Sequence, residues 1–143
     1  MDVLLRKTDE SARVPAFAHE GDSGLDLYSL EDTELKPLER KLVRTGISIE
    51  MPQGMEAQVR PKSGLALEHG ITLLNTPGTI DSSYRGEIKV LMVNLGDKVY
   101  RIGKNKKIAQ LVFARVEKPR LVEVDSLSDT TRKDGGFGST GLD

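Results

Sequence analysis

The chain has 143 residues, a length typical of one domain rather than two. Its 21 Lys and Arg residues nearly balance its 22 Asp and Glu residues, so the formal net charge is −1. This balance excludes the broad basic surface that binding to nucleic acids or anionic membranes requires. Cysteine is absent, which excludes disulfides, zinc sites with thiolate ligands and a cysteine nucleophile.

The first ten residues lack a basic segment followed by an apolar run, so the sequence predicts no signal peptide. No stretch approaches the roughly 18 consecutive apolar residues that a membrane span needs. We therefore expect a soluble, cytoplasmic protein that binds neither nucleic acid nor a membrane.

Alternation of apolar and polar residues, the pattern of half-buried strands, dominates the chain. In chain order, strands are predicted over residues 3–6, 25–29, 42–45, 46–51, 55–60, 71–74, 88–95, 108–116 and 121–124. Only residues 64–69 suggest a helix. Glycine and proline lie largely between these segments, where turns are expected. The pattern indicates an all-β fold, a compact barrel or sandwich of short strands.

Two polar residues stand out on these predicted strands. Asp26 lies between Leu25 and Leu27, so its side chain points away from theirs. A solvated carboxylate is the default interpretation, and a partner for metal-bound water is the sharper one. Gln110 interrupts an apolar strand and needs a hydrogen-bond partner if it is buried. Nearby, Lys104, Lys106 and Lys107 are expected to lie in a solvated loop.

Segment 60–67 places Lys62 and Ser63 at the start of the predicted helix. Ser63 is a favourable N-cap, and this interpretation is preferred. Free amides beside Lys62 also suit a phosphate group. Segment 75–87 is rich in turn-forming residues and predicts a hairpin. If this segment is functional instead, Asp81 is a carboxylate at the wall of a pocket, and the ring of Tyr84 offers a flat surface to a sugar or base.

From residue 126 the chain is polar and then glycine-rich, as in a frayed terminus. Residues 136–141 match the dinucleotide pattern G-x-G-x-x-G, but no helix follows and no βαβ unit precedes them, so a Rossmann site is rejected. Converging amides with Arg132 suit a phosphate group instead. An aromatic residue, Phe137, is unusual in a solvated linker.

Together and in this order, these segments resemble the five motifs of the trimeric deoxyuridine triphosphatase (dUTPase) family. The motifs are DSGLDLYS at 22–29, PKSGLAL at 61–67, NTPGTIDSSYRGEI at 75–88, KIAQLVF at 107–113 and RKDGGFGSTG at 132–141. The resemblance implies a distorted jelly-roll β-barrel with one short helix near residues 64–69. It also implies a catalytic domain over 1–125, a flexible arm over 126–143, and a homotrimer in which each active site is shared between chains.

The resemblance further implies Mg²⁺-dependent hydrolysis of dUTP to dUMP and pyrophosphate. In that reaction Asp81 would hold the attacking water, Tyr84 would pack on the deoxyribose, and Asp26 would act on Mg²⁺ through bound water. The other implied substrate contacts are Lys62, Ser63, Gly64, Asn75, Gly78, Ile80, Gln110, Arg132, Phe137, Gly138, Ser139 and Thr140.

Two alternatives remain open at this point. One is a regulatory module that binds dUTP without turnover. The other is the related dCTP deaminase, which uses a catalytic Glu where Leu91 stands here. The chain also departs from the dUTPase pattern at three places: Lys62 replaces Arg, residues 105–107 replace Gly-Asp-Arg, and Lys133 replaces Gly. Lys62 keeps the positive charge but loses bidentate geometry.

Overall fold

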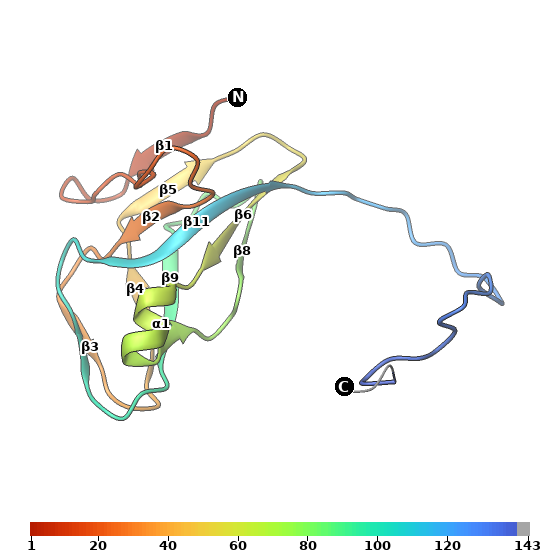
Figure 1. Ribbon diagram of the computed structural model, residues 1–143. Helices are drawn as coiled ribbons and strands as arrows, with labels where there is room; N and C mark the ends of the chain where they lie inside the picture. Colours follow the sequence, from red (N-terminus) through yellow and green to blue (C-terminus); the bar gives the residue numbers. More distant parts are fainter. Residues whose placement is uncertain (140–143) are drawn as a thin grey trace.

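The computed structural model describes residues 1–139 of the chain, and Figure 1 shows their arrangement. This part contains eleven short strands and one helix, α1 (Ser63–His69). The strands are β1 (Leu4–Lys7), β2 (Leu25–Tyr28), β3 (Thr33–Leu35), β4 (Arg40–Arg44), β5 (Ile47–Glu50), β6 (Met55–Arg60), β7 (Ile71–Leu73), β8 (Gly78–Asp81), β9 (Lys89–Asn94), β10 (Tyr100–Ile102) and β11 (Lys107–Arg115).

The strands pair in an antiparallel manner and form four sheets. The largest has the order β2-β11-β6-β8, and a second has the order β4-β9-β7. Two further pairs join β1 with β5 and β3 with β10. Within residues 1–139 the sheets do not close into one continuous barrel. The expected all-β fold with one short helix is confirmed, and the sheets share one apolar core.

Strand alternation separates the core from a polar surface on the largest sheet. On β6, Met55, Ala57 and Val59 are buried, while the residues between and after them are half-buried or exposed. On β11, Ala109 and Leu111 are buried in the same core. Polar side chains of the four strands therefore gather on the other face of this sheet.

The sequence pattern does not predict β3, β8 or β10. β3 and β10 have three residues each, too few for alternation to be recognised, and they are stabilised by pairing with each other. β8 lies in segment 75–87, whose Pro-Gly and Asp residues favour a turn. Pairing with β6, which sets Ile80 opposite Ala57, overrides this local preference. The hairpin predicted there is wrong, because the segment contains one strand only.

The strand predicted over residues 121–124 is wrong. These residues form no strand, and Leu121 is 92% exposed. A strand needs a neighbour for its backbone hydrogen bonds, and this segment has no pairing partner among residues 1–139. After β11 ends at Arg115, the chain instead leaves the body as an extended arm (Figure 1).

The predicted helix is confirmed and begins one residue early, at Ser63. The prediction that Ser63 is the N-cap is wrong, because Lys62 holds that position in an extended conformation and no side chain caps the helix. Gly70 ends the helix with φ 66°, and its N–H donates to the carbonyl of Ala66 at 3.1 Å. At seven residues α1 is too short to cross a membrane, and residues 1–139 contain no other helix.

Candidate active site

A pocket of about 320 Å³ lies beside β8 and the loop that follows it. Ile80 is buried and Asp81 is exposed, because successive side chains of a strand point to opposite faces. Tyr84 follows a turn in which its N–H donates to the carbonyl of Asp81 at 3.0 Å, and the residue is 46% exposed. The residues that line the pocket are Leu42, Thr79, Ile80, Asp81, Tyr84, Glu87, Ile88 and Lys89. The pocket therefore combines two carboxylates, a lysine, an aromatic ring and apolar walls.

Asn75 and Gly78 lie against each other at the start of β8. A Cβ atom on Gly78 would be 3.2 Å from Asn75 Nδ2 and 3.4 Å from Val59 Cβ. Glycine thus allows the backbone of β8 to approach both neighbours closely. The segment around β8 therefore brings together five of the predicted site residues, namely Asn75, Gly78, Ile80, Asp81 and Tyr84.

A second, charged pocket of about 220 Å³ surrounds Asp26 on β2. Asp26 Oδ1 lies 2.5 Å from Lys62 Nζ, and Oδ2 lies 2.6 Å from Lys107 Nζ. The Asp26 side chain is only 6% exposed, so the prediction of a solvated carboxylate is wrong. The prediction that Lys107 lies in a solvated loop is also wrong, since Lys107 begins β11 and its ammonium group lines this pocket.

The two lysines keep the buried carboxylate charged. Burial by itself would raise the pKa of Asp26, because it penalises the charged form. The hydrogen bonds from Lys107 and Lys62 outweigh this penalty and hold the pKa of Asp26 below its ordinary value. The same hydrogen bond to Asp26 raises the pKa of Lys107. The pocket is thus an ion-paired cluster at neutral pH.

Gln110 connects the charged pocket to the start of the helix. It is the cross-strand neighbour of Asp26 on β2 and of Arg60 on β6. Its Nε2 donates to the carbonyl of Pro61 at 3.0 Å, which supplies the partner that a polar side chain on this strand requires. A Cβ atom on Gly24 would lie 2.6 Å from Gln110 Oε1, so a larger residue at position 24 would displace the amide.

The remaining predicted site residues are at the helix start and in the arm. Ser63 and Gly64 are exposed in the first turn of α1, directly after Lys62. In the arm, Arg132 Nε donates to the carbonyl of Gly135 at 2.9 Å, and Phe137 is fully exposed. Gly138 has φ 91° and is followed by Ser139, whose N–H donates to the carbonyl of Gly136 at 3.0 Å. Thr140 lies outside the described residues.

The two pockets occupy opposite edges of one sheet. β2 and β8 flank β11 and β6, and with about 4.8 Å between neighbouring strands the edges are about 14 Å apart. The register separates them further: Asp81 pairs with Glu56, whereas Gln110, beside Asp26, pairs with Arg60 four positions along β6. A single chain therefore does not bring Asp81 and Asp26 into one site.

The donor groups of the charged pocket suit a cation that a ligand brings with it. Among residues 1–139, no group of three His, Asp or Glu side chains could hold a metal ion. Both oxygens of Asp26 are engaged by lysines. This arrangement fits an ion bound mainly by phosphate oxygens, with a carboxylate contact through water, better than an ion held by protein alone.

A family model described as dUTPase matches residues 10–141 of the chain. The chain belongs to the dUTPase family. A deoxyuridine 5'-triphosphate nucleotidohydrolase of Clostridium kluyveri is 57% identical over 141 residues, which cover 99% of each protein. The protein of the same name from Clostridium novyi is 54% identical over 142 residues, or 99% of this chain and all of that one.

The dUTPase fold is shared over the whole chain as well. A mutant of the dUTPase of Staphylococcus bacteriophage 80alpha, solved with dUpNHpp, superposes with a TM-score of 0.92. It is 25% identical, and the match covers 99% of both chains. These findings confirm the family that the five motifs indicate.

Two residues that line the pockets, Lys107 and Glu87, are not among the site residues that the motifs indicate. Regular alternation would place Lys107 on the face opposite to Gln110. A shift in register between Lys107 and Ala109 turns its side chain toward Asp26, and alternation alone cannot reveal such a bulge. Glu87 lines the pocket of Asp81 and Tyr84. The signal for Glu87 was its place between Gly86 and a strongly apolar strand.

Proposed function

We propose that the protein is a dUTP diphosphatase, which hydrolyses dUTP to dUMP and pyrophosphate by attack of water at the α-phosphate. The observation that carries this proposal is the pocket in which Asp81 and Tyr84 meet, in a chain of the dUTPase family. Two relatives more than 50% identical are named deoxyuridine 5'-triphosphate nucleotidohydrolases. A phage dUTPase of the same fold was solved with a dUTP analogue.

Asp81 holds the attacking water in this mechanism. A carboxylate is a weak base compared with an imidazole. Its useful work is to orient and polarise the water, which must lie in line with the leaving pyrophosphate. The exposed position of Asp81 at the end of a paired strand supports this role, since the strand fixes the direction of the carboxylate.

The residues around β8 recognise the deoxyuridine. Tyr84 packs on the deoxyribose and leaves no space for a 2′-hydroxyl group. The backbone of Gly78 and Ile80 reads the uracil edge, and Asn75, which lies against Gly78, supports this contact. Phe137, whose ring is fully exposed on the arm, stacks over the uracil.

Lys62, Ser63, Gly64 and Gln110 contact the phosphate chain. A triphosphate competes for the ammonium group of Lys62, and the oxygen of Asp26 that Lys62 leaves can accept a hydrogen bond from a water on Mg²⁺. When bound, Mg²⁺ neutralises charge on the phosphates during hydrolysis. Lysine makes a single-point contact where the family pattern has a bidentate arginine.

We include in the proposal a catalytic domain over residues 1–125, an arm over 126–143 and a homotrimer with shared active sites. A site that uses both pockets requires more than one copy, because the pockets lie at opposite edges of one sheet. The arm of another copy closes over the nucleotide, and Arg132, Gly138, Ser139 and Thr140 hold its terminal phosphate. Closure expels water from the site. A cytoplasmic location completes the proposal.

Pyrophosphate release in the presence of Mg²⁺ tests the proposed activity. The substrates compared are dUTP, dTTP, UTP and dCTP at equal concentrations, and we expect substantial release from dUTP alone. Binding of dUTP without release would indicate a regulatory module, and ammonia release from dCTP would indicate a deaminase. Equal rates with all four nucleotides would contradict the assigned specificity.

Asp81→Asn tests the chemical step, because the amide keeps the shape of the side chain and loses its charge. We expect turnover of dUTP to fall at least ~10²-fold, the lower end for groups that assist proton transfer. Binding of a non-hydrolysable dUTP analogue, measured by calorimetry, should stay near the wild-type value. Near-normal turnover in this variant would remove Asp81 from its role.

A further inference from the structure

Glu87 ties the loop after β8 to the segment between β4 and β5. Its Oε1 accepts hydrogen bonds from the N–H of Gly46 at 2.9 Å and from Arg44 Nε at 3.2 Å. Its Oε2 also lies 3.2 Å from Arg44 Nε. The Glu87 side chain is 13% exposed, so the carboxylate is largely shielded from water, whereas the Arg44 side chain is 42% exposed.

The backbone next to Glu87 is fixed in the same region. Thr45 Oγ1 donates to the carbonyl of Ile88 at 2.5 Å, and the N–H of Ile88 donates to the carbonyl of Ile47 at 2.8 Å. Ile88 itself is buried in the core. The end of the loop is therefore anchored to the core, and Glu87 carries this anchor one residue further toward the pocket.

The ring of Tyr84 is held through this anchored residue. The Tyr84 hydroxyl donates to the backbone carbonyl of Glu87 at 3.1 Å. The ring also covers Gly86 closely, since a Cβ atom there would lie 2.5 Å from Tyr84 Cζ and 2.9 Å from Cε2. The observed position of the ring thus depends on the anchor at Glu87 and on the lack of a side chain at Gly86.

We propose that Glu87 and Gly86 are positioning residues that set the discrimination between deoxyribose and ribose. This inference rests on the proposed function, in which the ring of Tyr84 excludes a 2′-hydroxyl group. A hydroxyl is excluded only by a wall that cannot yield, and the ring is a firm wall only while its far end is fixed. Glu87 acts through the hydroxyl of Tyr84, and Gly86 acts by leaving room for the ring.

The test compares kcat/KM for dUTP and UTP in variants at position 87. In Glu87→Ala we expect the dUTP/UTP ratio to fall at least about 10-fold, mainly through faster turnover of UTP. Glu87→Gln keeps an oxygen for the N–H of Gly46 and should retain most of the wild-type ratio. If Glu87 had only a structural role, its substitution would lower kcat/KM for dUTP and UTP by the same factor and leave their ratio unchanged.

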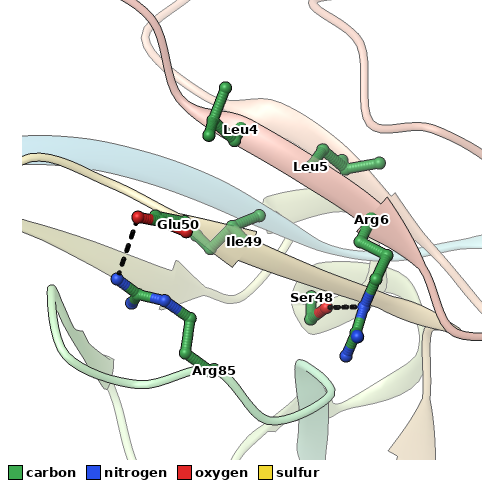
Figure 2. A pocket seen from close by; sticks show the side chains of 7 residues that line it. All are labelled: Leu4, Leu5, Arg6, Ser48, Ile49, Glu50 and Arg85. Carbon is green, nitrogen blue, oxygen red and sulfur yellow. Dashed lines mark hydrogen bonds and ion pairs between the residues drawn. The ribbon is translucent and has the colours of Figure 1, made fainter.

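Glu50→Ala is the matched control. Figure 2 shows Arg85, in the same loop, reaching Glu50 at the end of β5, and Arg85 Nη2 lies 3.3 Å from Glu50 Oε1. Like Glu87→Ala, this substitution removes a carboxylate paired with an arginine, but it leaves the contact between Tyr84 and Glu87 intact. We expect the dUTP/UTP ratio of Glu50→Ala to equal that of the wild type.

Gly86→Ala keeps the inference testable if Glu87→Ala does not fold. Its methyl group displaces the ring of Tyr84 without removing an ion pair, and we expect the same loss of selectivity. Circular dichroism and thermal unfolding establish that each variant is folded. An unchanged dUTP/UTP ratio in folded Gly86→Ala or Glu87→Ala overturns the inference. If the wild type hydrolysed no dUTP, the proposed function would fail. The inference would still be decided by calorimetry, which compares the affinities for dUMP and UMP in the same variants.

Discussion

The two lysines of the charged pocket are held in place by one buried carboxylate. Asp26 binds Lys62 through one oxygen and Lys107 through the other, and the three side chains come from β2, the helix start and β11. Such a cluster brings two ammonium groups together at one place in a chain whose net charge is −1. A triphosphate therefore meets local cations and needs no broad basic surface.

Asp26→Asn should lower the free energy of unfolding by about 1–3 kcal/mol at pH 7, because it leaves two lysines without their anion.

Folding lowers the pKa of Asp26 from its ordinary 3.8, so this stabilisation is complete above that value and is lost as pH falls through the folded-state pKa. Folding raises the pKa of Lys107 from its ordinary 10.5, so its share is complete below that value and is lost as pH rises through the folded-state pKa. Lys107 is half exposed, so solvent screens its share.

Urea unfolding of Asp26→Asn and of the wild type, from about pH 3 to about pH 11 in EDTA, measures this dependence. The difference between the two proteins should be largest near neutrality and shrink toward both ends. A difference that stays constant at every pH would show that Asp26 contributes only by its shape.

At the scale of elements, alternation predicts the strands that are long enough to show it. β6 has six residues and β11 nine, and both were expected at nearly their observed bounds. β3 and β10 are too short, and β8 forms against its local turn preference because β6 pairs with it. The segment 121–124 shows the converse, since strand-like residues form no strand where no partner is present in the described chain.

The candidate site was predictable to the extent that its residues lie close in sequence. Residues 75–84 form one strand, β8, with a bend before it and a turn after it, so the motif brings Asn75, Asp81 and Tyr84 together by itself. The ion pairs of Asp26 join residues 36 and 81 positions apart, and they depend on strand order and on a bulge at Lys107. Tertiary structure, which one sequence does not reveal, decides such contacts.

Removal of residues 132–143 tests the role of the arm. The arm residues described after Arg115 lie outside every sheet, so the truncated protein should keep its thermal unfolding temperature. Turnover of dUTP should fall about 10²-fold, because the contacts that orient the nucleotide are lost. Phe137→Ala in the full-length chain is the control for the aromatic contact alone. Full activity of the truncated protein would contradict closure by the arm.

For the whole molecule, the separation of the two pockets is the decisive feature. Asp81 and Asp26 lie at opposite edges of the sheet β2-β11-β6-β8, about 14 Å apart across the strands. Water held at one edge cannot attack a phosphate held at the other. If Asp81 holds the water and Lys62 and Gln110 hold the phosphates, as we propose, the reaction requires two copies of the chain, one that supplies Asp81 and Tyr84 and one that supplies Lys62 and Gln110.

Activity of mixed oligomers tests this requirement most directly. Asp81→Asn and Gln110→Ala chains are each assayed alone with dUTP, and are then refolded together in equal amounts. If the two pockets of a site come from different chains, random assortment gives about a quarter of the sites both intact pockets, and dUTP turnover should recover to about a quarter of the wild-type rate. A mixture no more active than the two variants assayed apart would contradict the shared site.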